Sequence, residues 1–303
     1  MSDTVIRSGT VPLAVRDVGG DGPPLLLLPG AGGNLAGLVP FAGLLRAAYR
    51  VVVVDLRGHG RSGDGPWNWD AVDADLVAVA TELRLDAPAV VGVSLGGMVA
   101  AHWAARHPEC PGAVNLDGNP TPVRADQLVG LDVEEATGEL ARLEAVFTTM
   151  AGAFAAPLTS EQVAQFRDAH LAMVARHGQP EEVALAAFDR NLVVDGGAVR
   201  LRPGPEVLAR VRELMAELDL VPLYRDLTVP LLHVLATEDL PEQRPFARLY
   251  GAYRRGLGGR LAEVAAANPR LRVHPLAGAS HAMVVECPGP LAELVIRFLG
   301  AVR

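Results

Sequence analysis

Short, fully apolar segments alternate with longer amphipathic segments over the first third of the chain. Segments 25–28 and 51–54 contain only Leu and only Val, which is typical of parallel β-strands covered on both faces. Between such segments, apolar residues recur three and four positions apart, as in amphipathic helices. The pattern predicts strands at 10–16, 24–28, 50–55, 89–93 and 113–116, and helices at 35–48, 70–85 and 94–107. This alternation favours an α/β fold with a largely parallel sheet.

The alternation stops after Asp117. Up to residue 226 the apolar positions keep helical spacing with almost no strand signal. We expect helices there at 134–154, 160–177 and 181–191, and after this stretch strands at 229–235 and 271–276 with helices at 245–267 and 290–299. The chain is therefore predicted to form a core from 1–117 and 227–303, with a helical cap insertion at 118–226.

Composition limits the partners and the compartment. The chain has 303 residues, 50% of them hydrophobic, and carries a net charge of −8, with 35 acidic residues against 27 basic ones that are all Arg. This balance argues against nucleic acid as a partner, because a protein needs a basic face to bind it. No apolar run approaches the ~20 residues that cross a bilayer, the N-terminus does not resemble a secretion signal, and two cysteines suit a reducing compartment. We expect a cytoplasmic protein without a membrane partner.

The strongest chemical signal is the segment 92–96, Gly-Val-Ser-Leu-Gly, between an apolar strand and a helix. A serine on such a turn is held at the carboxyl edge of the sheet, and glycines flank it because side chains would crowd the turn. The alternative is an ordinary tight turn with a solvated serine. The strand before it and the helix after it favour Ser94 as a nucleophile.

At these residues the chain resembles the α/β-hydrolase family, and the resemblance extends over nearly the whole length. It includes Leu-Pro-Gly-Ala-Gly-Gly at 28–33, which is similar to the family's oxyanion loop, Asp-Leu-Arg-Gly-His-Gly-Arg-Ser at 55–62, and Gly-Ala-Ser-His at 278–281. Pro29 stands where the family usually has His, so no side-chain role is expected there. The resemblance implies a mostly parallel eight-stranded sheet with helices on both faces and a helical cap.

A serine needs a neighbouring base to take its proton. Of eight histidines, only His281 follows the last predicted strand in a loop of small residues, at the edge where such loops converge. The family's order of Ser, acid and His supports the same choice. His281 is predicted to be the catalytic base, and His59 a residue that braces its glycine-rich loop.

The base needs a carboxylate that fixes its tautomer, and two candidates follow strands. Asp239 lies in Ala-Thr-Glu-Asp, which is similar to the family's Gly-x-x-Asp with Ala236 in place of the glycine. Asp117 follows the preceding strand, where some family members place the acid. We favour Asp239, and regard Asp117 as the alternative acid, a hinge or substrate-contacting group, or a simple turn residue.

Negative charge that develops on a carbonyl oxygen is usually stabilised by backbone N–H groups. The N–H of Leu95, directly after the serine, is expected to supply one, and by resemblance the N–H of Ala31 supplies the other. The glycine-rich loop at 29–34 lacks G-x-G-x-x-G and a Walker lysine, so nucleotide binding is not expected. We predict no cofactor and no metal.

The cap is predicted to cover the site. Its large apolar side chains either pack the cap's own core or line an acyl or ring pocket; they are Phe147, Met150, Phe154, Phe166, Met173 and Phe188. Two tryptophans of the core, Trp67 and Trp69, are expected to line the same pocket. We expect a small, largely apolar substrate and a serine hydrolase that cleaves an ester, thioester or lactone. The alternatives are a non-hydrolytic cyclase, eliminase or acyl transferase of secondary metabolism, and a binding protein without turnover.

Overall fold

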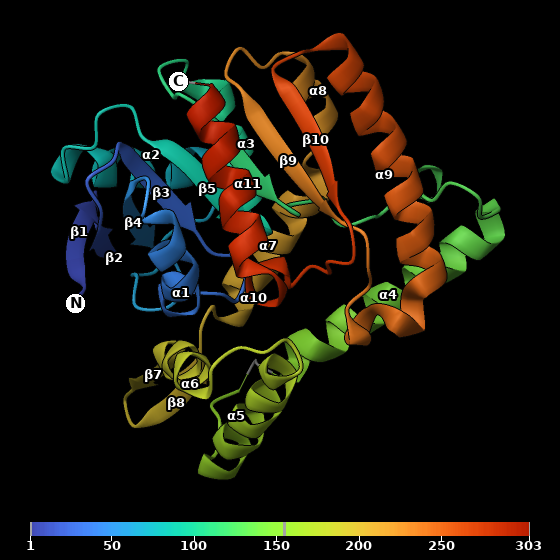
Figure 1. The fold of residues 1–303 in the computed structure, drawn as a ribbon. Helices are drawn as coiled ribbons and strands as arrows, with labels where there is room; N and C mark the ends of the chain where they lie inside the picture. The colour runs from blue at the N-terminus through green and yellow to red at the C-terminus, as the bar shows by residue number, and fades with distance from the viewer. Residues whose placement is uncertain (1, 154–155, 303) are drawn as a thin grey trace.

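A sheet of eight strands runs through the molecule between two layers of helices (Figure 1). The computed structural model describes residues 2–153 and 156–302. Along the sheet the strand order is β1-β2-β4-β3-β5-β6-β9-β10, with β1 and β2 antiparallel to their neighbours and the others parallel. The strands are β1 (Thr4–Ser8), β2 (Val11–Gly19), β3 (Pro24–Leu28), β4 (Arg50–Val54), β5 (Ala89–Val93), β6 (Ala113–Leu116), β9 (Leu231–Ala236) and β10 (Leu271–Leu276). The predicted mostly parallel eight-stranded sheet is confirmed.

The apolar strands explain the two layers. Residues 25–28 and 51–54 are almost completely buried, and alternate residues of each strand point into two separate apolar clusters, one on each face of the sheet. The helices of the core are α1 (Leu35–Leu45), α2 (Trp69–Glu82), α3 (Leu95–Arg106), α9 (Ala247–Ala267), α10 (Met283–Glu286) and α11 (Pro288–Ala301). One cluster contains residues of α1 and α11, and the other contains residues of α2, α3, α9 and the short helix α8 (Leu220–Arg225).

Most of the chain between β6 and β9 is helical. The helices are η1 (Ala125–Gln127, a 3₁₀ turn), α4 (Val133–Ala153), α5 (Ser160–Ala175), α6 (Glu181–Arg190), α7 (Pro205–Glu217) and α8 (Leu220–Arg225), and a further 3₁₀ helix, η2 (Pro241–Phe246), follows β9. In Figure 1, α5 and α6 lie at the bottom of the view, away from the sheet, whereas α8 packs back onto α3.

The expectation that this segment has almost no strand is wrong at one place. β7 (Leu192–Asp195) and β8 (Ala198–Leu201) form an antiparallel hairpin. Gly196 and Gly197 both adopt positive φ, +56° and +82°, which a two-residue hairpin turn of this hand requires. The sequence Asp-Gly-Gly-Ala between two apolar runs is typical of such a hairpin. It was overlooked because the apolar residues on either side of this region have helical spacing.

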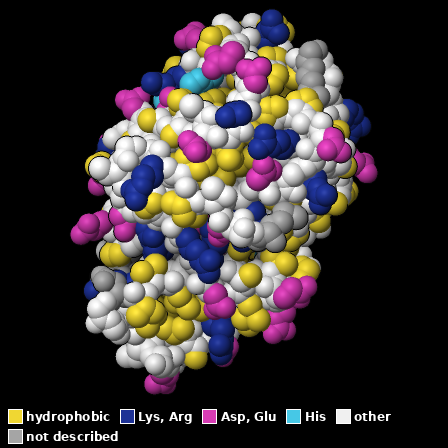
Figure 2. Space-filling model, turned by 90° about the vertical axis from the view of Figure 1, so that its left-hand side faces the viewer, with side chains coloured by type: hydrophobic (Ala, Val, Ile, Leu, Met, Phe, Trp, Pro, Cys, Tyr) yellow, Lys and Arg dark blue, Asp and Glu magenta, His cyan; other side chains and the backbone are white. Residues whose placement is uncertain are grey.

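The described residues contain no helix with both the length and the apolar character needed to cross a membrane. On the face shown in Figure 2, arginines and acidic side chains are interspersed rather than separated into patches. That face therefore offers no continuous basic surface for a polyanion.

Candidate active site

Ser94 lies on the sharp turn between β5 and α3. Its backbone angles are φ +53° and ψ −117°, a strained combination for a residue with a side chain. The flanking glycines make the turn possible: a Cβ on Gly92 would lie 1.9 Å from the Gly96 carbonyl oxygen, and one on Gly96 would lie 2.5 Å from the Leu28 carbonyl oxygen. The local sequence thus permits the turn that holds Ser94 at the carboxyl edge of the sheet, where the sequence predicts it.

His281 lies in the loop that follows β10. The carbonyl of Ala279 accepts hydrogen bonds from the N–H groups of Thr237 and Glu238 at 2.9 and 3.0 Å, which ties this loop to the one after β9. Ser280 is fixed in turn by Glu286, whose carboxylate accepts from the Ser280 N–H and hydroxyl at 2.8 and 2.7 Å. The backbone directly before the histidine is therefore anchored.

The prediction that Asp239 is the carboxylate in contact with His281 is wrong. His281 Nδ1 lies 2.6 Å from Asp117 Oδ2, while the Asp239 carboxylate forms an ion pair with Arg254 of α9. The reason is geometric: β6 lies between β5 and β9 in the sheet, so the residue that ends it stands between the Ser94 turn and the His281 loop. Asp239 comes three residues after the end of β9, where its side chain turns toward α9.

Several polar groups hold Asp117 in place. Its backbone has a φ of +52°, and its other oxygen, Oδ1, accepts hydrogen bonds from the Ala236 N–H and the Asn119 side chain, both at 2.9 Å. The next turn is closed by Asn115, whose side chain accepts from the Gly118 N–H at 2.7 Å and donates to its carbonyl at 2.9 Å. The carboxylate that faces His281 is thus held by two hydrogen bonds to Oδ1, and the turn after it is closed by Asn115.

Beneath Asp117, a buried chain of hydrogen bonds continues through residues that the sequence did not reveal. Asn115 donates to the Tyr224 hydroxyl at 2.8 Å, and that hydroxyl contacts His233 Nδ1 at 3.0 Å. All three side chains are fully buried, and burial lowers the pKa of His233 to about 4. His233 is therefore neutral at physiological pH, as a structural group and not a base. An Asn and a His inside apolar strands were the only signals in the sequence.

The ionisation of His281 depends on its carboxylate partner. Burial lowers its pKa, but the hydrogen bond and the charge of Asp117 raise it more, so the net pKa lies above the ordinary value of 6.5. Its side chain remains 37% exposed. The arrangement suits a base that must be stabilised when it takes up a proton.

The two predicted oxyanion donors occupy suitable backbone positions. Leu95 is the first residue of α3, so its N–H has no carbonyl partner within the helix. Ala31 lies in the turn closed by the hydrogen bond from the Gly33 N–H to the Gly30 carbonyl, 3.0 Å long. A Cβ on Gly30 would lie 3.0 Å from the Ser94 Cβ, so this loop passes directly beside the serine. Their role as donors remains a prediction.

The end of α6 is attached to the core beside this loop. Asn191 Nδ2 donates to the Gly32 carbonyl at 2.8 Å, and Asn34 Nδ2 donates to Asn191 Oδ1 at 2.9 Å. Next to it, the buried Arg190 donates to the fully buried Asp55 carboxylate at 2.7 Å. The segment between β6 and β9 thus contacts the predicted oxyanion loop through specific polar side chains.

Ser94, Asp117 and His281 line one cavity of about 660 Å³, within the range of small-molecule sites. Most of its wall is apolar, and Phe147 of α4 and Met215 of α7 contribute to it.

Among the other predicted pocket residues, the described ones do not line this cavity. Trp67 and Phe188 are buried by packing, and Met173 is 40% exposed. Phe154 and the side chain of Met150 lie outside the described residues.

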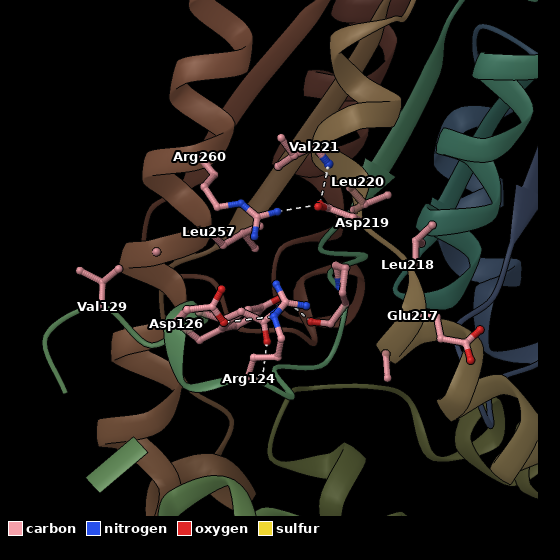
Figure 3. Close-up of a pocket in the computed structure, with 15 residues that line it drawn as sticks. Arg124, Asp126, Val129, Glu217, Leu218, Asp219, Leu220, Val221, Leu257 and Arg260 are labelled. Atoms are coloured by element: carbon pink, nitrogen blue, oxygen red, sulfur yellow. Dashed lines mark hydrogen bonds and ion pairs between the residues drawn. The ribbon is translucent and has the colours of Figure 1, made fainter. Parts of the chain in front are cut away.

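A second cavity of about 250 Å³ adjoins the first and shares Pro120, Tyr253 and Leu257 with it. Four of its five charged side chains form two ion pairs, Arg260 with Asp219 at 2.6 Å and Arg124 with Asp126 at 3.1 Å (Figure 3). It contains neither Ser94 nor His281. The first cavity is therefore the candidate active site. The described residues also contain no group of three or more His, Cys, Asp and Glu placed to hold a metal ion.

Comparison with known proteins identifies the family and supports the observed fold. Residues 25–294 match the sequence model of the Alpha/beta hydrolase family. The chain belongs to this family. Its curated relatives match only in part: it is 43% identical over 91 residues to the pimeloyl-(acyl-carrier protein) methyl ester esterase of Chromobacterium violaceum, covering 30% of this chain and 34% of that enzyme. The corresponding esterase of Xanthomonas oryzae pv. oryzae is 36% identical over 110 residues, 36% of this chain and 42% of that enzyme.

Solved structures of the family match over the full length at lower identity. E-2-(acetamidomethylene)succinate hydrolase has a TM-score of 0.70 at 22% identity, and covers 99% of both chains. The enol-lactonase from Burkholderia xenovorans LB400 has a TM-score of 0.64 at 21% identity, covering 99% of this chain and 100% of that one. These likenesses establish the fold of this hydrolase family member, whose chemistry has to be argued from its own site.

Proposed function

We propose that this α/β-hydrolase cleaves an ester, thioester or lactone through an acyl-enzyme, with Ser94 as nucleophile, His281 as base and Asp117 as the orienting acid. The observation that carries the proposal is the 2.6 Å contact between His281 Nδ1 and Asp117 Oδ2, inside the cavity that Ser94 also lines. The partial matches to methyl ester esterases support an ester substrate.

In the first step the Ser94 hydroxyl attacks the substrate carbonyl and passes its proton to His281 Nε2. Asp117 makes this possible in two ways. It accepts a hydrogen bond from the Nδ1–H group, which leaves Nε2 free as the proton acceptor, and its charge stabilises the imidazolium that forms. The raised pKa of His281 reflects the second effect, since burial alone would lower it.

Negative charge then develops on the carbonyl oxygen. The N–H groups of Leu95 and Ala31 are the proposed donors to it, and each such donor is typically worth about 10²- to 10³-fold in rate. Collapse of the intermediate expels the alcohol, thiol or ring oxygen, which takes the proton from His281. Water, activated by the same histidine, releases the acid from Ser94 in the second half of the reaction.

The segment 118–226 is proposed to act as a cap over the site. Phe147 and Met215 bring apolar surface from it into the cavity, and Arg190 and Asn191 fasten it to the core. An apolar acyl or ring group beside the scissile bond would bury its surface there.

The test is labelling with a fluorophosphonate probe followed by intact-mass spectrometry, on the wild type and on Ser94→Ala. The expected result is one added probe mass on the wild type and none on the variant. Steady-state release of free acid from a simple ester then identifies a hydrolase. Unlabelled wild-type protein would refute the nucleophile, and acylation without release of acid would point instead to acyl transfer or cyclisation.

A further inference from the structure

Two arginines form part of the otherwise largely apolar wall of the candidate active site. Arg254 and Arg255 both lie on α9 and both line the cavity that contains Ser94. Neither side chain is buried, since Arg254 is 35% exposed and Arg255 is exposed. Both charges are therefore accessible to a ligand that enters the cavity.

Arg254 is held from one side and open on the other. One of its terminal nitrogens, Nη1, pairs with the Asp239 carboxylate, which is 16% exposed and does not line the cavity. The described residues provide no acceptor for its Nε or Nη2. A guanidinium has a planar edge of two parallel donors that matches a carboxylate. Asp239 thus orients the group and leaves donors available to a ligand.

Arg255 adds positive charge that no acid neutralises. Its Nε and Nη2 donate to the backbone carbonyl of Val129 at 3.2 and 2.9 Å, and within the described part of the chain it forms no ion pair. The acids of the cavity lining are Asp117, which is engaged with His281, and Glu238, which is exposed to solvent. The part of the cavity lining formed by Arg254 and Arg255 is therefore the region that favours an anion.

The helix surface next to Arg254 is open. Gly251 and Gly258 lie one turn before and one turn after it and also line the cavity. A Cβ on Gly258 would meet nothing within 4 Å, and one on Gly251 would meet only the Arg255 Nη1, at 3.6 Å. A small planar group such as a carboxylate has room beside the guanidinium.

We propose that Arg254, oriented by Asp239, binds a carboxylate of the substrate, so that the preferred substrate is an ester with a free carboxylate remote from its scissile bond. This inference rests on the proposed ester hydrolysis at Ser94. It makes Arg254 a specificity-determining residue and places an apolar linker between the two polar ends of the substrate.

The test compares monomethyl with dimethyl esters of straight-chain dicarboxylic acids, from glutaric to suberic acid, by their kcat/KM. We expect the wild type to prefer the half ester at its best chain length. Arg254→Gln should lower the half-ester to diester ratio about tenfold or more, as for loss of a charge-assisted hydrogen bond. Arg254→Lys should be intermediate, because lysine keeps the charge without the fork.

Arg248→Gln is the matched control. Arg248 lies on the same helix, pairs with Glu135 at 2.8 Å and lies outside the cavity lining, so this variant should keep the wild-type ratio. A wild-type ratio at or below one for every chain length would overturn the inference, as would an equal loss for both esters in Arg254→Gln. If that variant does not fold, the wild type still decides: the ratio must fall with added salt, and a ratio that salt does not change refutes the carboxylate subsite.

Different results would refute the carboxylate subsite and the serine mechanism. Diester turnover with labelled Ser94 but no preference for the half ester would remove only the carboxylate subsite. Absence of both turnover and labelling would remove the serine mechanism itself, and the subsite with it.

Discussion

Replacing Asp117 with asparagine isolates the orienting role of the acid. The amide keeps the size of the side chain but can present an N–H to His281 Nδ1, which stabilises the tautomer that carries its proton on Nε2. In a serine protease the same change costs about 10⁴-fold in kcat. We expect a loss of that order here, because Asp117 is the carboxylate in contact with His281, at 2.6 Å.

The pH dependence provides a second, independent readout. His281 must be neutral to accept the serine proton, so kcat/KM of the wild type should fall as the pH drops through the raised pKa, with a midpoint above 6.5. Without the charge of Asp117 only the lowering effect of burial is left. The midpoint of the residual activity of Asp117→Asn should therefore move to lower pH.

Asp239→Asn is the matched control, since it makes the same chemical change at the end of the neighbouring strand. Its ion pair with Arg254 is partly exposed, and such pairs contribute little. With a neutral ester as substrate, kcat should fall less than about tenfold, and the acid limb of the profile should stay in place. Stopped-flow or steady-state assays across pH 5 to 9 measure both. A larger loss in Asp239→Asn than in Asp117→Asn would refute the reasoning.

Three further outcomes follow from the same geometry. Ser94→Ala and His281→Ala should each remove nearly all turnover, and the double variant should be no slower than either, because the two groups act as one unit; a multiplicative loss in steady-state assays would contradict this. Arg190→Ala should lower the free energy of unfolding in urea by about 3 kcal/mol, because it leaves the buried Asp55 carboxylate without its ion-pair partner; a change within error would show that the backbone N–H donors to Asp55 suffice. Phe147→Ala should change the preference among acyl chain lengths more than it changes the melting temperature, with about 1–3 kcal/mol of discrimination per methylene; an unchanged profile of kcat/KM against chain length would place Phe147 outside the acyl pocket.

The sequence by itself predicted seven of the eight strands of the sheet, all except β1, and the positions of two residues of the candidate site. Continuous apolar runs are readable because a parallel strand covered on both faces needs no alternation. Ser94 was readable because only glycines fit around its turn, and His281 because it follows the last strand among small residues. These features are local, because each can be recognised from a few neighbouring residues in the sequence.

Only the tertiary structure decided which carboxylate meets the histidine. Asp117 and Asp239 both follow parallel strands at the carboxyl edge of the sheet. The residues next to each of them in the sequence do not show which carboxylate contacts the histidine. The choice depends on β6 lying between β5 and β9, on the hydrogen bond from the Ala236 N–H that turns Asp117 toward the site, and on Arg254, which draws Asp239 away. These partners are far apart in the chain, and a hydrogen bond between distant residues leaves no periodic pattern in the sequence. The contact of Asn191 with the Gly32 carbonyl depended on the fold for the same reason.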